Sequence, residues 1–330
     1  MKKDFVSVAV CTYNGELYIE EQLNSILHQT VPVDEIVIGD DGSEDGTIIK
    51  AEKILSAGNI SYKIIKNEKN LGYRKNFENV ILNTRGNIIF LCDQDDVWLE
   101  NKVDVMLRHF ESNSKCLLVF SDGYLVDETL AELPLSLWEA VYYNKKKIEA
   151  ASWWELFLGG YYVTGAAMAV RRELFDKAYP FSDIWQHDGW LAVYASVFGE
   201  IEEEPFKLIK YRQHGKNQIG ADSNRTLRAQ IKKKKEIIKK GAAVQKEGHD
   251  FMYKRYIELM HRCGENLDKE KKKQLKEVVV FGRKMKALSN RKRIKSIRII
   301  MSCWKHGDYK RYCKKSLGTM LGDLIFLFVP

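Results

Sequence analysis

Several features that would assign a chain to a familiar class are missing from this sequence. Its six cysteines include no CxxC pair, and Cys11, Cys92 and Cys116 lie in apolar runs. That placement indicates small buried side chains in a reducing compartment. Neither GxGxxG nor GxxxxGK(S/T) occurs, so a bound nucleotide would not be held by a glycine-rich phosphate loop.

Long apolar runs are missing too. The apolar residues after Lys2 and Lys3 form too short a run for a secretory signal, and no small-residue cleavage site follows them. Near the other end, residues 320–329 are apolar but few, and Asp323 lies among them. We therefore expect neither a signal peptide nor a membrane-spanning helix.

The composition is that of a folded chain with two differently charged parts. Of 330 residues, 45% are hydrophobic and 30% charged, which allows a large core in one large or two ordinary domains. From Arg225 onward there are 30 basic and 10 acidic residues, a net charge of +20. The preceding residues carry 23 basic and 35 acidic ones, a net charge of −12. The two parts are expected to meet different partners.

Strand and helix patterns alternate through the acidic part. Apolar runs predict strands at 5–11, 35–39, 60–66, 87–92, 116–121 and 160–170. Helical periodicity predicts helices at 16–29, 74–83, 99–110 and 190–198, a helix or turn at 152–158, and a helix capped by Ser43. Short connections between such elements predict a largely parallel sheet covered by helices.

The fourth predicted strand runs directly into Asp93-Gln94-Asp95-Asp96. Ligands of open α/β sheets bind at the carboxyl ends of strands. Carboxylates this close repel one another unless a cation lies among them, and Mg²⁺ or Mn²⁺ prefers such oxygens. The alternative is a solvated acidic turn before a helix, whose N-terminus also favours acids.

A second acidic pair, Asp40-Asp41, ends the second predicted strand, and the first strand ends at Thr12 and Asn14. Polar groups at one sheet edge are what a nucleotide site needs. Residues 41–52 also nearly match a calcium loop. A calcium loop of that type follows a helix, however, and a strand is predicted here.

An ordered set of segments resembles glycosyltransferase family 2, and Asp93 to Trp98 resembles its bacterial rhamnosyltransferase-like branch. The resemblance covers roughly the first two thirds of the chain and rests on residues 10–14, 35–43, 72–77, 93–98, 164–166, 187–191 and 211–217. It implies a GT-A fold, which is Rossmann-like, a nucleotide-sugar donor and a divalent metal, Mn²⁺ or Mg²⁺.

The resemblance also implies roles for individual residues. Asp95 is the expected metal ligand, with Asp93 on the ribose or the metal, and His214 as a further ligand or a diphosphate contact. Asp40 is expected to contact the base. The other expected donor contacts are Thr12, Asn14, Arg74, Asn76, Gly165 and Arg212. Arg212, His214 and Lys216 recur at alternate positions, which suits a phosphate-facing strand or plain surface.

Glycosyl transfer from a nucleotide diphosphate needs one carboxylate rather than two. The diphosphate leaves readily once a metal neutralises its charge, so a single base that accepts the proton of the attacking hydroxyl suffices. The resemblance places this base at Asp188 and implies inversion at the anomeric carbon. The alternative is that Asp188 only caps the helix at 190–198.

The basic part, residues 225–330, is predicted to be helical. Its Lys and Arg clusters and its apolar end indicate binding to an anionic membrane surface or to a protein partner. No nucleic-acid module is recognised, and we expect no nucleic-acid partner. Solvated faces are the alternative for each Lys run.

The sequence thus predicts a GT-A domain at 1–224, with a nucleotide-binding half at 1–121 and an acceptor half at 122–224, followed by the helical basic region. The expected enzyme transfers a sugar such as rhamnose from a UDP- or dTDP-sugar to a lipid-linked saccharide acceptor in bacterial surface polysaccharide synthesis. It would act in the cytoplasm, on the inner face of the membrane, and an oligomer is allowed. The rival expectation is a non-catalytic nucleotide- or calcium-binding module with a basic tail.

Overall fold

The structure is a computed structural model that describes residues 4–141, 143, 152–160, 162–215, 242–288, 293–313 and 316–328. The chain divides into two compact units, of which the first contains residues 1–143 and 162–223 and the second contains residues 144–161 and 224–330. The second unit thus includes residues 144–161, which the sequence analysis assigns to the first domain.

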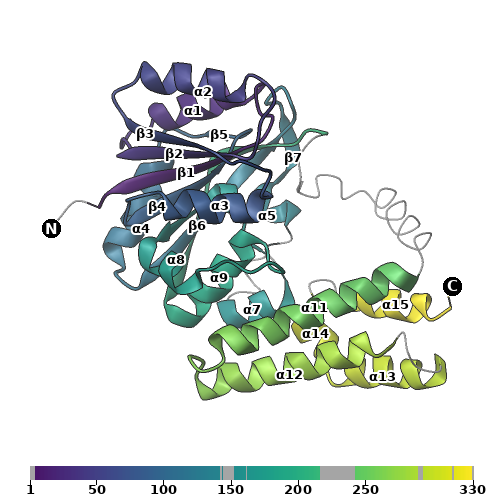
Figure 1. The fold of residues 1–330 in the computed structure, drawn as a ribbon. Coiled ribbons are helices and arrows are strands. Elements are labelled where there is room, and N and C mark those ends of the chain that lie inside the picture. The colour runs from purple at the N-terminus through teal and green to yellow at the C-terminus, as the bar shows by residue number, and fades with distance from the viewer. Residues whose placement is uncertain are drawn as a thin grey trace. The chain divides into compact units, whose positions relative to one another are not determined.

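The first unit is built on one nine-stranded sheet (Figure 1). The order across it is β3-β2-β1-β4-β8-β6-β9-β5, and β7 pairs with β6. The strands are β1 (Val6–Thr12), β2 (Glu35–Asp40), β3 (Ser61–Lys66), β4 (Ile88–Asp93), β5 (Val97–Trp98), β6 (Cys116–Val126), β7 (Glu132–Ser136), β8 (Met168–Arg171) and β9 (Glu200–Arg212).

The strand register brings the predicted polar ends together. Strand β1 pairs in parallel with β2 and β4, and β2 pairs in parallel with β3, as the sequence predicts. Every residue of β1 and β2 is buried. Thr12 lies opposite Asp40, and Cys11 lies opposite Asp93. The acidic ends of β2 and β4 therefore flank the end of β1 at one edge. Strand β8 runs antiparallel to both β4 and β6, so the sheet is mixed.

Helices cover both faces of this sheet. Apolar residues of α1, α2 and α4 join one core cluster with β1, β2 and β4, while α3, α8 and α9 lie on the other side (Figure 1). The bounds are α1 (Ile19–Leu27), α2 (Thr47–Ser56), α3 (Tyr73–Leu82), α4 (Lys102–Ser112), α5 (Leu137–Ala140), the 3₁₀ turn η1 (Gly165–Ala167), α8 (Arg172–Ala178) and α9 (His187–Phe198).

Three local predictions were wrong. The strand expected at 160–170 is confined to β8, because η1 occupies Gly165–Ala167. Residues 97 and 98 pair with β9, so α4 begins at Lys102 rather than near 99. Ser43 does not cap α2, whose N-cap is Gly46; instead its hydroxyl bonds the carboxylate of Asp40.

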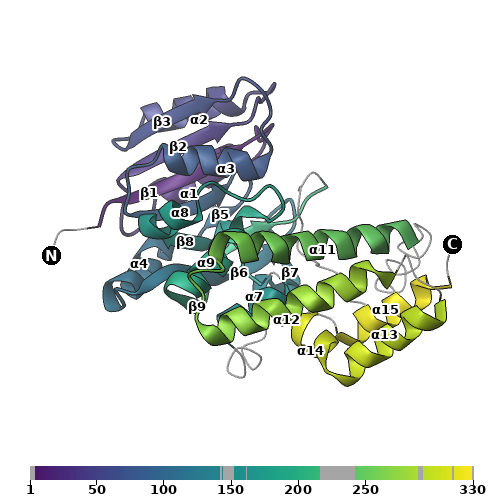
Figure 2. The ribbon, with the colours of Figure 1, turned by 60° about the horizontal axis from the view of Figure 1, so that its bottom comes forward.

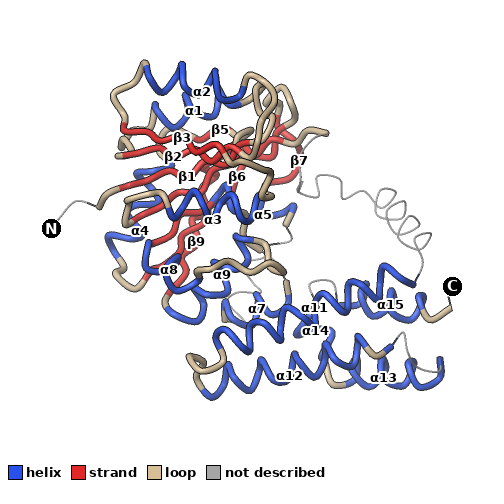
Figure 3. The backbone as a smooth tube through the Cα atoms, in the orientation of Figure 1, coloured by secondary structure: helices blue, strands red, loops and turns tan. Residues whose placement is uncertain are grey.

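The described part of the second unit is helical (Figure 3). Helix α11 packs along α12, and α13 lies beside α15, as both ribbon views show (Figures 1 and 2). The helices are α7 (Trp153–Gly159), α11 (Ala242–Cys263), α12 (Lys269–Lys286), α13 (Arg293–Lys305), α14 (Asp308–Tyr312) and α15 (Ser316–Phe326). In the described residues, we find no helix with the length and apolarity that crossing a membrane requires.

The buried side chains largely match the sequence interpretation. Cys11, Cys92 and Cys116 are buried free thiols, as predicted, and burial raises the pKa of each. Trp154, Trp185 and Trp190 are fully buried, so they are core residues rather than open faces on which a sugar could stack. Inside α15, the carboxylate of Asp323 accepts a hydrogen bond from the Tyr309 hydroxyl at 2.7 Å.

One ion pair between α4 and β9 gives the first unit a pH-dependent stability. His109 contacts Glu202 at 2.6 Å and Glu204 at 2.9 Å. Burial lowers the pKa of His109, but these hydrogen bonds and charges outweigh burial and raise it above its usual value. The stabilisation is complete below the unfolded-state pKa and is lost as the pH rises through the folded-state pKa.

His109→Gln should therefore reduce the free energy of unfolding more at pH 5.5 than at pH 8.5. The expected difference is about 1 kcal/mol, since the pair is only partly buried. Urea unfolding of both proteins at the two pH values measures it. An equal loss at both values would show that the imidazolium charge does not contribute.

Candidate functional site

The carboxylates after β4 are crowded and partly withdrawn from water. Burial, together with the charges of Asp95 and Asp188, raises the pKa of Asp93 to about 7, although the charge of Lys102 acts in the opposite direction. Asp96 is only 1% exposed, and burial raises its pKa as well. A solvated acidic turn would leave Asp96 exposed, so that alternative is wrong for Asp96.

Arg212 and His214 hold this acidic segment in place. The Arg212 backbone N–H donates to Asp96 Oδ1 at 2.9 Å, and its guanidinium donates to the carbonyls of Asp95 (2.8 Å) and Glu128 (2.6 Å). His214 Nε2 lies 2.7 Å from Asp95 Oδ2. The ring of Tyr18 stacks on His214, with ring centroids 4.7 Å apart.

The expectation that Arg212 faces a phosphate is not supported, because its side chain is 2% exposed and also pairs with Glu21. It fixes the acidic segment instead. Lys216, which the same alternate pattern includes, lies outside the described residues.

The ends of β1 and β2 form the second part of the edge. Thr12 Oγ1 donates to Asp40 Oδ1 at 2.8 Å, and the Ser43 backbone N–H donates to Asp40 Oδ2 at 2.9 Å. Asn14 adopts a left-handed conformation with φ of 50°, which Asn tolerates better than most residues. Its side-chain oxygen accepts the Glu44 backbone N–H at 2.9 Å. Thr12 and Asp40 are buried, whereas Asn14 is exposed.

A supporting network lies behind this edge. The carboxylate of Asp41 accepts the backbone N–H groups of Leu71 (2.7 Å) and Gly72 (2.8 Å). Asn76 is 1% exposed; its amide nitrogen donates to the Gly39 carbonyl, and its oxygen accepts from Asn67. Asn76 therefore supports the end of β2 and the loop after β3, and its side chain is withdrawn from the surface. The near-match to a calcium loop follows strand β2, as expected.

Arg74 and Gly165 lie on the other side of the edge, near the start of α9. The Arg74 guanidinium donates to the Asp183 carbonyl. The Gly165 N–H donates to Asp188 Oδ2 at 3.3 Å. A Cβ on Gly165 would come within 2.5 Å of His187 Nε2, so only glycine allows this close approach.

Asp188 lies in the first turn of α9, but the N-cap of that helix is Gln186. The capping alternative is therefore wrong. Its neighbour His187 is buried, stacks on Phe77 at a centroid distance of 4.2 Å, and has its pKa lowered by burial, which favours the neutral ring. Asp188 is half-buried, and its charge raises the pKa of Asp93, so the two carboxylates lie at the same edge.

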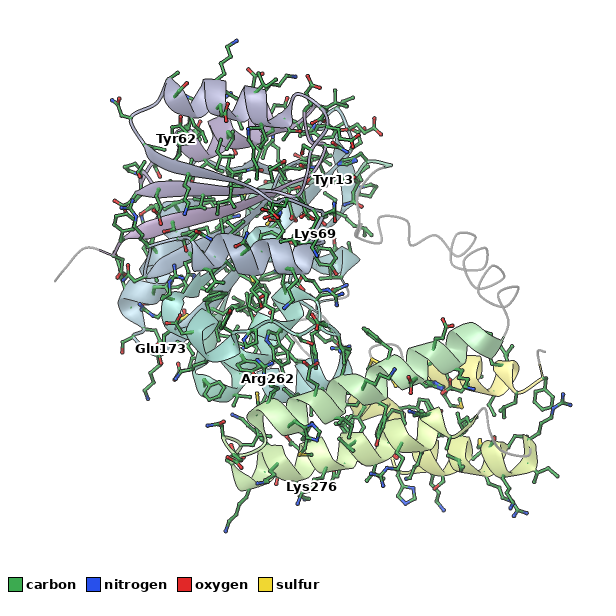
Figure 4. All side chains as sticks on the ribbon, viewed as in Figure 1. Tyr13, Tyr62, Lys69, Glu173, Arg262 and Lys276 are labelled. Carbon is green, nitrogen blue, oxygen red and sulfur yellow. The ribbon has the colours of Figure 1, made fainter. Side chains whose placement is uncertain are left out.

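The donor set of this edge fits a hard divalent cation. Carboxylate oxygens are the ligands that Mg²⁺ and Mn²⁺ prefer, and the buried Asp96 Oδ2 accepts no hydrogen bond from any residue that the structure describes. Among the described residues, no three His, Cys, Asp or Glu side chains already surround one metal position. Binding would therefore require the carboxylates of Asp93 and Asp95 to adjust. In Figure 4, oxygen atoms gather near Tyr13 and Lys69 at this edge.

Sequence reasoning missed two residues of this edge. Gln94 bonds the backbone N–H and carbonyl of Tyr13 through its side-chain amide, at 2.8 and 3.0 Å. Lys102 is 0% exposed, and its ammonium donates to the Ala166 carbonyl at 2.7 Å. No local pattern marks either residue, because both act across long sequence separations.

Comparisons with known proteins support the fold and the family. The model of "Glycosyl transferase family 2" matches residues 7–178. An uncharacterized glycosyltransferase of Haemophilus influenzae is 28% identical over 217 residues, 64% of this chain and 66% of its own length. The dTDP-rhamnosyl transferase RfbG of Shigella flexneri is 28% identical over 232 residues, 64% of this chain and 74% of its own length. The chain thus spans about two thirds of the length of these relatives.

Solved structures show the same fold at low identity. The chain is similar to residues 1–349 of S. aureus TarS in complex with UDP-GlcNAc, with a TM-score of 0.57 at 15% identity, covering 98% of this chain and 89% of the other. It is also similar to the mannosyltransferase PcManGT from Pyrobaculum calidifontis in complex with GDP-Man and Mn²⁺, with a TM-score of 0.53 at 14% identity, covering 99% and 87%. The mixed sheet with helices on both faces is a GT-A fold, and the chain belongs to glycosyl transferase family 2.

Proposed function

We propose that the protein is an inverting, metal-dependent glycosyltransferase that moves a sugar from a nucleotide diphosphate to a hydroxyl of a saccharide acceptor. One observation carries this proposal. The acidic segment follows β4, and the neighbouring strand β8 begins just after Gly165, whose N–H donates to Asp188 Oδ2 at 3.3 Å, so residues from distant parts of the chain meet at one edge. A donor diphosphate held at the acidic segment would lie beside Asp188, the proposed base.

On the donor side, Asp40, Thr12 and Asn14 would contact the nucleotide, with Arg74 at the rim. Asp95 and Asp93 would hold Mn²⁺ or Mg²⁺, and His214, already 2.7 Å from Asp95, would hold or orient that ligand. A cation held there would supply positive charge to offset the charge that grows on the departing diphosphate. The net charge of −12 before Arg225 supports the need for it, since a bare diphosphate would be repelled.

On the acceptor side, Asp188 would accept the proton of the attacking hydroxyl at a carboxylate oxygen. Its Oδ1 accepts the Gly189 N–H at 2.6 Å and its Oδ2 accepts the Gly165 N–H at 3.3 Å, which orients the carboxylate. Attack from the side opposite the leaving diphosphate inverts the anomeric carbon. Gly165 would let the donor sugar approach the backbone closely. Arg212 and Asn76 are left out of the donor contacts because Arg212 braces the acidic segment and Asn76 bonds the Gly39 carbonyl behind the edge.

The proposed donor is a UDP- or dTDP-sugar, and rhamnose is the first sugar to test, given the name of the Shigella relative. The proposed acceptor is a lipid-linked saccharide in bacterial surface polysaccharide synthesis. A thermal-shift screen of nucleotide sugars with Mn²⁺ selects the donor, and transfer or donor hydrolysis then separates an enzyme from a module that only binds.

The second unit supports a proposed place on the inner face of the cell membrane. Along α15 and the turn that follows it, Leu317, Leu321, Ile325 and Phe328 are 42–60% exposed, and their spacing puts them on one helical face. The Arg293 guanidinium of α13 lies 5.7 Å from the Phe328 ring centroid, so basic side chains border the apolar face. An apolar face edged by Lys and Arg suits the headgroup region of an anionic bilayer.

Asp95→Ala and Asp188→Ala should each lower transfer by at least about 100-fold, because one removes a metal ligand and the other the base. Only Asp95→Ala should also weaken Mn²⁺-dependent donor binding, which calorimetry measures. Glu111→Ala, at an exposed carboxylate of α4, is the control and should leave both unchanged. Near-normal turnover in either site variant contradicts its assignment.

Gly165→Ala should displace His187 and Asp188, since the new Cβ would lie 2.5 Å from His187 Nε2. We expect a loss of about 1–3 kcal/mol in the free energy of unfolding and a large loss of turnover. Gly248→Ala is the control: nothing lies within 4 Å of its Cβ position in α11, so it should be neutral or stabilising. Unaltered turnover in the Gly165→Ala variant would show that the close packing of Gly165 against His187 is not needed for the reaction.

For the membrane proposal, Leu321→Gln/Ile325→Gln should lower binding to vesicles with anionic lipid by about tenfold or more, because two apolar side chains no longer enter the bilayer. Val280→Gln on α12, at a position 48% exposed, is the matched control. Co-sedimentation measures the bound fraction. Equal binding by the double variant and the original protein, or no binding by either, would refute the proposed face.

A further inference from the structure

Lys102 is a buried cation to which the proposed reaction gives no role. It is the first residue of α4 and is 0% exposed, although lysine is almost never fully buried without a partner. Burial lowers the pKa of Lys102 to about 7, although Cys92, Asp96 and Asp93 act in the opposite direction. Removing a lysine amine from water is unfavourable, so a buried lysine has partners that compensate for its lost hydration.

The ammonium of Lys102 contacts both parts of the site edge. It donates to the carbonyl of Ala166 at 2.7 Å, and it lies 4.0 Å from the ring centroid of Trp98. Ala166 is the middle residue of η1, and Trp98 ends the segment that begins with Asp93. One charge therefore ties together two segments that lie more than sixty residues apart in sequence.

The acidic segment is the second partner of this charge. The charge of Lys102 acts against the rise in the pKa of both Asp93 and Asp96. Asp96 Oδ2 is buried and accepts no hydrogen bond from the described residues, so a positive charge near it is favourable.

From Ala166 the connection continues to the proposed base. The preceding residue, Gly165, donates its N–H to Asp188 Oδ2 and packs directly against His187. A shift of η1 would therefore move the hydrogen-bond donor that orients the Asp188 carboxylate. The Lys102–Ala166 and Gly165–Asp188 bonds thus form a continuous connection from the start of α4 to Asp188.

We propose that Lys102 is a positioning residue: its ammonium sets the distance between the metal-binding segment and the base Asp188. The inference rests on the proposed function, since it assigns the reaction roles of those two segments. Lys102 touches neither donor nor acceptor in this account. It affects turnover by holding the acidic segment and Asp188 at the distance that the reaction needs. A shift of about 1 Å between reacting groups is enough to lower the rate about 100-fold.

Lys102→Met tests this, because it keeps the length of the side chain and removes both the charge and the donor. We expect kcat to fall by about 10- to 100-fold while the KM for the donor stays within about threefold, since Asp40 and Thr12 are untouched. Lys102→Arg keeps the charge and a donor, so it should retain more of kcat than the Met variant.

Arg171→Met is the matched control. Arg171 is also a cation that donates to backbone carbonyls, those of Cys116 (2.8 Å) and Phe110 (2.7 Å), and lies over the Phe110 ring. It pairs with the start of β4, at the opposite end from Asp93. Its loss should lower stability with no selective loss of kcat.

Hydrogen exchange supplies a measurement that does not depend on catalysis. In Lys102→Met, the amides of 164–167 should exchange at least severalfold faster than in the original protein, and in Arg171→Met they should not. Unchanged exchange there, wild-type kcat in Lys102→Met, or equal losses in all three variants would overturn the inference. If the original protein transfers no sugar at all, the proposed function fails, and the exchange experiment still decides whether Lys102 holds η1.

Discussion

Mutual repulsion among the carboxylates after β4 is the constraint on which the site depends. Asp96 is buried, so water does little to screen its charge. Burial and neighbouring carboxylates also raise the pKa of Asp93 to about 7. Basic side chains from separate elements contact this segment: Lys102 at the start of α4, Arg212 at the end of β9, and His214 just after it. These contacts fix the backbone of the acidic segment and leave its carboxylates short of positive charge. A divalent cation would complete the balance.

The mixed sheet explains how a base comes to lie beside this acidic segment. Strand β8 inserts antiparallel between β4 and β6, so its first residue lies at the same edge as the last residue of β4. The η1 turn that precedes β8 is brought there with it, and Gly165 in that turn bonds Asp188 at the start of α9. One strand insertion therefore couples the two halves of the site. The fold brings the acidic segment and Asp188 to the same edge, and individual hydrogen bonds orient their side chains.

The sequence predicts those features of the fold and site that are local. The apolar runs of β1, β2 and β4 predict buried parallel strands, and from them the meeting of Thr12, Asp40 and Asp93 at one edge follows. Errors arise where tertiary contacts override local pattern. Ser43 follows a strand as a helix cap would, yet its hydroxyl bonds Asp40, and the small residues around Gly165 form a 3₁₀ turn instead of a strand. Arg212 alternates like a surface residue but is buried, because partners far along the chain satisfy it.

The central claim is that a cation bridges the acidic segment and a pyrophosphate. Anomalous diffraction from crystals grown with Mn²⁺ and a nucleoside diphosphate tests it most directly. The account predicts one strong peak about 2 Å from a carboxylate oxygen of Asp95 and from a phosphate oxygen, at the edge shared with Asp40 and Asp188. A peak in the loop after β2, or a nucleotide bound at this edge with no metal beside Asp95, would contradict it.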